Sequence, residues 1–189
     1  MRFAFRLAIP AILAAIALAA HADTVTYTES VTASGTLGKE NFTNALVTIT
    51  GSADTSTITQ FGSAFNVVTP DSQVTVAGIG TFLLTGTIDF FDNNSVGVAG
   101  VTDVVDIVDT VNTVFDTYNL QTAIGPITGS FLGNLGTNFS TSGGGLVLTS
   151  AGDSTFQATE SAVPEPSSLA LLGTGILGLV GAARRKLSR

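Results

Sequence analysis

The sequence predicts an all-β protein with a single antiparallel β-sandwich or jelly-roll-like domain at residues 23–162. Three observations lead to this fold class. Threonine, valine, serine, glycine and phenylalanine dominate this part of the chain, and β-branched and aromatic residues favour strands. Short alternations of apolar and polar residues are separated by Gly, Pro, Asn and Asp, as in antiparallel sandwiches. The 140 residues of this range are enough for one ordinary hydrophobic core.

Residues 1–22 have the pattern of a secretory signal peptide. Two arginines precede an apolar stretch at 7–20, and Ala20 and Ala22 form a small-x-small cleavage pattern. Cleavage after Ala22 removes His21, which is the only histidine of the chain. We therefore expect an exported protein that uses the general secretion machinery and whose mature chain has no histidine.

Eight segments of the predicted domain have strand character. They are 24–32, 45–50, 65–69, 73–77, 80–91, 96–101, 145–149 and 154–158. The first of them alternates most clearly, with Val25, Tyr27 and Val31 on one face. Turn-forming residues separate the strands and predict turns at 70–72, 92–95 and 151–153. We expect the last of these turns to close a hairpin between the final two strands.

The segment 103–112 follows neither the two-residue period of a strand nor the 3.6-residue period of a helix. One interpretation is an Asp-rich loop or edge that binds Ca²⁺ through carboxylate oxygens, although the spacing does not match an EF-hand. The other is a solvated strand edge whose charges discourage pairing with other chains. The candidate ligands for the metal are Asp103, Asp106 and Asp109, with Asp89 and Asp92 as further carboxylates. No other cofactor is expected.

The predicted domain is strongly acidic. It contains thirteen Asp and Glu residues and one basic residue, Lys39, so its net charge is 1 minus 13, or −12. A surface of this charge repels nucleic acid phosphates and anionic lipid headgroups, which excludes nucleic acid as a partner. The chain has no cysteine, so the fold relies on burial and sheet hydrogen bonds without disulfides.

The residue types of the predicted domain do not support catalysis. Without histidine and cysteine, neither a Ser-His-Asp nor a Cys-His arrangement can form, and zinc would have carboxylate ligands alone. A glycosidase needs only two carboxylates, but such sites usually also offer Trp, Arg or His to the sugar, and this domain has none of them. We therefore expect no catalytic residues and no enzymatic activity.

The last 27 residues, 163–189, form a second targeting segment with three parts. They are the triplet Pro164, Glu165 and Pro166, an apolar run at 169–183, and the basic cluster Arg184, Arg185 and Lys186. The prolines keep the chain extended, and the basic cluster stays on the cytoplasmic side of a membrane. As a helix the apolar run covers about 22 Å of a hydrocarbon core of roughly 30 Å. It is thus either a weak tail anchor or a transient segment handed to a membrane enzyme.

These three parts, in this order and at the end of the chain, resemble the PEP-CTERM sorting signal of Gram-negative bacteria. The resemblance implies recognition by an exosortase, a membrane-embedded protease-transpeptidase that removes the helix. It also implies transient insertion into the inner membrane, followed by delivery to the cell surface or extracellular matrix. The resemblance does not imply any biochemical activity of the domain at 23–162.

Three segments inside the domain are also similar to parts of many small PEP-CTERM exported proteins: 116–120, 125–129 and 154–158. The similarity implies no enzymatic activity. By local physics, Gly125 and Gly129 are expected in turns, and Tyr118, Leu120 and Phe156 in the core or on a sheet face.

The family resemblance implies a structural or interaction component of the exopolysaccharide or biofilm layer, because exosortase systems accompany exopolysaccharide production. The alternative is a module whose acidic loops bind Ca²⁺ and, through it, a polysaccharide.

Overall fold

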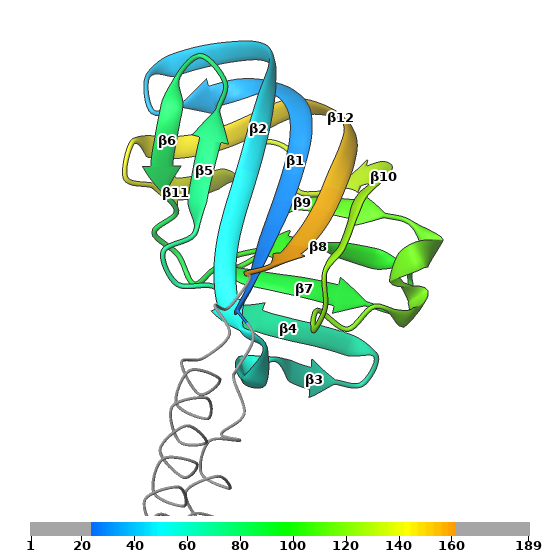
Figure 1. The fold of residues 1–189 in the computed structure, drawn as a ribbon. Helices are drawn as coiled ribbons and strands as arrows, with labels where there is room; N and C mark the ends of the chain where they lie inside the picture. The colour runs from blue at the N-terminus through cyan, green and yellow to red at the C-terminus, as the bar shows by residue number, and fades with distance from the viewer. Residues whose placement is uncertain (1–23, 162–189) are drawn as a thin grey trace, which may run out of the picture. The chain divides into compact units, whose positions relative to one another are not determined.

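The computed structural model describes residues 24–161, which form twelve β-strands and two short 3-10 helices (Figure 1). The strands are β1 (Thr24–Leu37), β2 (Glu40–Asp54), β3 (Thr59–Phe61), β4 (Ala64–Val68), β5 (Gln73–Val76), β6 (Gly80–Leu83), β7 (Asp89–Asn93), β8 (Val98–Thr102), β9 (Asp106–Val111), β10 (Ile124–Leu132), β11 (Asn138–Thr141) and β12 (Gly144–Glu160). The 3-10 helices are η1 (Thr55–Thr57) and η2 (Thr113–Thr117). Since every pairing between these strands is antiparallel, the prediction of an all-β antiparallel domain is confirmed.

The strands belong to one hydrogen-bonded sheet, whereas the sequence predicted a sandwich or jelly roll of two sheets. Its order is β3-β4-β7-β8-β9-β10-β12-β1-β2-β5-β6, and β11 pairs with β12. The long strands β1, β2 and β12 bend strongly, and β4, β7 and β8 lie across them (Figure 1). The sheet is therefore a strongly curled, open half-barrel whose two halves face each other.

The corner of the curled sheet lies in β10, which changes its partner along its length. Residues 124–129 pair with β12, and residues 130–132 pair with β9. A strand that passes between two packed layers makes such a corner. A side chain at Gly129 would collide with the carbonyl oxygen of Val111, so a glycine lets β9 approach at this point. Gly125 and Gly129 thus lie inside a strand, and the prediction that they form turns was wrong.

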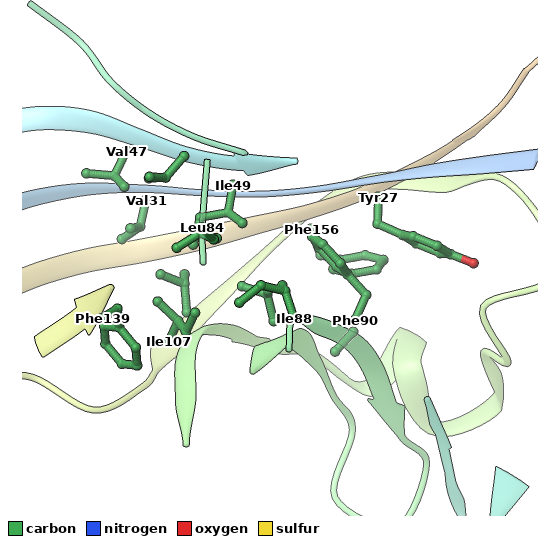
Figure 2. Close-up of a cluster of buried hydrophobic side chains, with 14 of the residues drawn as sticks. Tyr27, Val31, Val47, Ile49, Leu84, Ile88, Phe90, Ile107, Phe139 and Phe156 are labelled. Carbon is green, nitrogen blue, oxygen red and sulfur yellow. The ribbon is translucent and has the colours of Figure 1, made fainter. Parts of the chain in front are cut away.

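The core fills the space between the two halves of the sheet (Figure 2). From β1, β2 and β12 it receives Tyr27, Val31, Val47, Ile49 and Phe156, and from the opposite side Ile88, Phe90, Ile107 and Phe139. Phe156 makes edge contacts with Phe115 and Tyr118 at ring-centroid distances of 5.5 and 6.0 Å, a favoured aromatic geometry. Tyr118, Leu120 and Phe156 are all buried, which confirms their predicted place in the core.

Sheet edge β6 is partly closed against the segment that contains β11. The backbone N–H of Thr85 donates to the carbonyl of Ser140 at 3.0 Å, and the N–H of Ser142 donates to the carbonyl of Leu83 at 2.8 Å. An isolated bridge pairs Leu84 with Thr141. The segment after β6 is therefore joined to β11 by a few hydrogen bonds, without a continuous ladder between the two strands.

One turn prediction and one strand prediction were wrong, because both depend on which strands pair. The expected turn at 151–153 is part of the continuous strand β12. Val31 of β1 pairs with Ser154 of β12, and Ala33 pairs with Ala151. Between these two pairs β12 has one residue more than β1, so the turn-forming residues 151–153 make a β-bulge. The predicted strand 80–91 is divided into β6 and β7, because the chain passes there from one half of the sheet to the other.

The segment that resisted a strand interpretation contains strand β9, which lies inside the sheet between β8 and β10. Residues 106–111 are therefore neither an exposed loop nor a strand at the sheet edge, so both interpretations were wrong for this part of the segment. A register shift between Val101↔Val108 and Thr102↔Asp106 inserts a bulge at Ile107. The bulge interrupts the two-residue alternation, and this is why the sequence pattern did not show a strand.

Candidate functional site

The two ends of the domain meet at one place. Val25 pairs with Glu160, and the backbone N–H of Ser161 donates to the carbonyl of Thr24 at 2.9 Å. The Glu160 Oε1 atom accepts a hydrogen bond from the backbone N–H of Ala123 at 2.9 Å, which fixes the end of β12 against the loop before β10. The backbone hydrogen bonds between β1 and β12 therefore continue to Ser161, the last described residue. The predicted targeting segment at 163–189 follows almost directly after the folded domain.

The residues predicted to act in targeting lie outside the described residues 24–161. They are the cleavage residues Ala20 and Ala22, the triplet Pro164, Glu165 and Pro166, and the basic cluster Arg184, Arg185 and Lys186.

The three aspartates predicted as calcium ligands occupy different surroundings. The Asp103 side chain lies against Gly86, and its charge adds to burial in raising the pKa of Asp89. Asp106 begins β9, and its carbonyl accepts two hydrogen bonds of 3.1 Å from Asn134. Asp109 is buried and lies over Gly100. Within residues 24–161 no three acidic groups gather closely enough to hold a metal ion, so no described cluster supports the calcium site.

Three acids, Glu29, Asp92 and Asp109, are completely buried. Glu29 shares the inner face of β1 with Tyr27 and Val31. Its Oε1 atom accepts a hydrogen bond of 2.5 Å from the Thr110 hydroxyl, and its Oε2 atom has no partner in the structure. Burial therefore raises the pKa of Glu29 well above its ordinary value. Glu29 was not among the predicted site residues, although the alternation at 24–32 places it on the apolar face.

Asp92 lies on the inner face of β7 and is linked to the segment around η2 through Asn94. Its Oδ1 atom accepts a hydrogen bond of 2.7 Å from the side-chain amide of Asn94, whose nitrogen also lies 2.7 Å from the carbonyl oxygens of Phe115 and Tyr118. Burial, and then the charge of Asp116, raise the pKa of Asp92 to about 7. Asn94 thus joins a buried carboxyl to the backbone around η2.

Asp109 is a buried acid in the middle of the central strand β9. Its cross-strand neighbours are Gly100 on β8 and Leu132 on β10, and neither of its oxygens has a hydrogen-bond partner. Burial, and then the charge of Asp106, raise the pKa of Asp109 to about 9. At neutral pH this carboxyl is protonated. Since it is buried, it does not meet a substrate from solvent.

An open hollow lies on the outer side of the sheet, near the start of β5. It is lined by Thr50, Gly51, Ser52, Pro70, Asp71 and Gln73. Hydrolysis of a glycoside by the usual mechanism requires two carboxyl groups, and this lining holds one. Thr50, Ser52 and Gln73 also line the hollow, and their side chains are uncharged and can form hydrogen bonds. The hollow is therefore suited to binding a polar molecule by hydrogen bonds.

The family comparison identifies the C-terminal segment. The model of the PEP-CTERM protein-sorting motif matches residues 162–186, which are 25 of the 189 residues of the chain. The protein thus carries the motif of exported proteins that an exosortase sorts to the cell surface, and the resemblance stated from the sequence is confirmed. No curated protein and no solved structure matches the chain.

None of the helices among residues 24–161 has the length and apolar character needed to cross a membrane. The predicted apolar run at 169–183 lies outside these residues.

Proposed function

We propose that the protein is a structural or interaction component of the exopolysaccharide or biofilm layer and acts there by binding, without catalysis. The observation that carries this proposal is the PEP-CTERM motif at 162–186, which directly follows the end of the folded domain at Ser161. Exosortase processing then delivers the domain to the cell surface and the matrix.

The position of the chain ends supports this proposal. The first and last strands, β1 and β12, pair along almost their whole length in the middle of the sheet. Removal of the residues before Thr24 and after Ser161 leaves these hydrogen bonds in place. The mature domain therefore keeps its sheet when both targeting segments have been cut away, as a protein that persists outside the cell requires.

The composition supports a binding role in a hydrated layer. With a net charge of −12, the mature range 23–162 stays soluble and does not adhere to anionic lipid surfaces. The absence of histidine and cysteine from this range leaves no nucleophile–base pair of the usual kind.

The test follows a tagged protein in its native host. A short epitope after Gly62 suits this purpose, because Gly62 lies in the exposed β3–β4 turn and a side chain there would meet no atom within 4 Å. Cells, matrix and medium are separated from the wild-type host and from a host without the exosortase. We expect the protein in the matrix with its C-terminus between residues 163 and 167, and the full C-terminus in cell membranes of the second host.

A triple variant, Pro164→Ala with Glu165→Ala and Pro166→Ala, leaves residues 24–161 unchanged and should behave as in the host without the exosortase. Deletion of the gene should weaken the biofilm, and the wild-type gene, but not the triple variant, should restore it. A biofilm of unchanged cohesion after deletion, or a processed protein confined to the periplasm, would contradict the proposal.

A further inference from the structure

We propose that the outer face of strands β10, β12, β1, β2, β5 and β6 binds an uncharged polysaccharide chain through ordered rows of hydroxyl and amide side chains. This inference rests on the proposed function in the exopolysaccharide layer and names the ligand class and the surface. The register of the six strands determines which side chains are neighbours on this face.

One row of hydroxyl side chains crosses all six strands. Residues that are directly paired in an antiparallel sheet point to the same face, and five consecutive pairings join residues with a hydroxyl group. In strand order the row consists of Thr128, Thr155, Ser30, Thr48, Thr75 and Thr81. No strand in the series interrupts it.

Two further rows lie beside the first, two residues along each strand. The second row consists of Gln157, Thr28, Thr50, Gln73 and Leu83, and the third of Thr159, Thr26 and Ser52. The open hollow described above is lined in part by Thr50, Ser52 and Gln73. The third row therefore ends at this recess, and the second row passes along it, so a bound chain can be partly enclosed there.

Hydrogen bonds between neighbouring strands hold part of this array in place. The hydroxyl oxygens of Thr26 and Ser52 are 2.8 Å apart, those of Thr75 and Thr81 are 2.8 Å apart, and those of Thr128 and Thr155 are 2.9 Å apart. A hydroxyl has one donor and two acceptor sites, so each bonded pair keeps one donor and three acceptor sites for a ligand. Because these side chains are already ordered, less entropy is lost on binding.

The spacing of the array also suits an extended polymer. Neighbouring strands lie about 4.8 Å apart, so the first row offers hydroxyl groups at nearly regular intervals across six strands. A chain of sugar units carries hydroxyl groups at regular intervals as well. The threonine methyl groups between the hydroxyls can contact the C–H groups of sugar rings.

The charge distribution decides which kind of polymer this face accepts. Residues 24–161 contain twelve acids and one lysine, a net charge of −11, yet none of the fourteen residues in the three rows is charged. An anionic polysaccharide would be repelled by the domain as a whole, and so would a second copy of the chain. A cationic polymer would be drawn to the acids outside the rows. An uncharged chain is the ligand that this face favours.

The curvature of the sheet adds a further restriction. The long strands β1, β2 and β12 that carry the centre of the rows are strongly bent (Figure 1). A flat, rigid lattice such as a polysaccharide crystal would touch only a small part of a bent face. A single flexible chain can follow it, so we assign the face to individual chains in a hydrated matrix.

The test measures binding by the exported protein purified from its host. The probes are dextran as an uncharged chain, the part of the host's exopolysaccharide that passes through an anion exchanger, and alginate as an anionic chain. The test variant combines Thr28→Val, Thr48→Val and Thr75→Val, which remove three hydroxyl groups while keeping side-chain shape and strand propensity. The matched control combines Thr59→Val, Thr113→Val and Thr117→Val, three exposed threonines outside the rows.

We expect the wild-type protein and the control to bind the uncharged host fraction, with little change between low and high salt because no ion pair forms. The test variant should bind at least tenfold more weakly, because it removes three hydroxyl groups that can form hydrogen bonds with the chain. A second variant, Thr48→Glu with Thr75→Glu, keeps the surface polar and should show the same loss.

Equal binding by wild type and test variant would overturn the inference, and so would tighter binding of alginate or no binding of the uncharged host fraction. In each of these cases the matrix fractionation and the deletion phenotype still test the proposed function separately.

Discussion

Replacement of Asp109 by asparagine should make the stability of the protein less sensitive to rising pH. The Asp109 carboxyl is buried without a hydrogen-bond partner for either oxygen. Asparagine has nearly the same shape as the protonated carboxyl and does not ionise. We therefore expect wild type and Asp109→Asn to have similar stability at acidic pH, and the variant to be the more stable protein at alkaline pH.

The size of this effect follows from the two pKa values of Asp109. The pKa is 3.8 in the absence of structure and is raised by burial to about 9 in the fold. Between these values the folded protein binds one proton more than the unfolded chain, so the free energy of unfolding falls as pH rises. The fall is about 1.4 kcal/mol per pH unit, or about 4 kcal/mol between pH 4.5 and 7.5. Below pH 3.8 this contribution to stability is fully present.

Urea unfolding followed by circular dichroism at several pH values measures this dependence. Glu29 and Asp92, whose pKa values are also raised, lower the stability of both proteins with rising pH. Because the charge of Asp109 helps to raise the pKa of Glu29, the difference between the proteins reports the ionisation of Asp109 together with its interaction with Glu29. The wild-type protein should lose about 4 kcal/mol more than Asp109→Asn between pH 4.5 and 7.5. Asp153→Asn, which removes an exposed carboxyl in the β12 bulge, is the matched control. Parallel pH profiles for wild type and Asp109→Asn would refute the reasoning.

Three further substitutions test the fold. Gly129→Ala should destabilise the corner in β10 by about 1–3 kcal/mol through overpacking. Gly152→Ala, whose added Cβ would make an ordinary contact of 3.7 Å with the carbonyl oxygen of Thr32, should change the melting temperature little. Tyr27→Phe removes the hydroxyl that donates a buried hydrogen bond of 2.6 Å to the carbonyl of Leu120, and should lower the free energy of unfolding in urea by about 1–3 kcal/mol. An unchanged urea midpoint would contradict a stabilising role of this bond. Phe156→Ala should cost about 3–5 kcal/mol, and Phe61→Ala, at a side chain that is 87% exposed, should cost almost nothing.

The targeting signals and the local strand pattern could be read from the sequence. The triplet Pro164 to Pro166 and the basic residues after 183 are adjacent in the chain, so a family resemblance was sufficient to assign them. The alternation of Val25, Tyr27 and Val31 likewise identified the inner face of β1, and all three side chains are buried. These features depend on neighbours in sequence, and residue type alone determines them.

The pairing of distant segments was decided by the tertiary structure. Residues 151–153 have the composition of a turn, but β1 lies beside them and makes them a bulge in β12. The acidic strand β9 lies in the middle of the sheet because β8 and β10 pair with both of its sides. The alternation of a strand shows which of its residues share a face, but not which strand lies beside it, because pairing depends on contacts between residues far apart in the chain. The burial of Glu29 and the hydroxyl rows across six strands arise only once those contacts have formed.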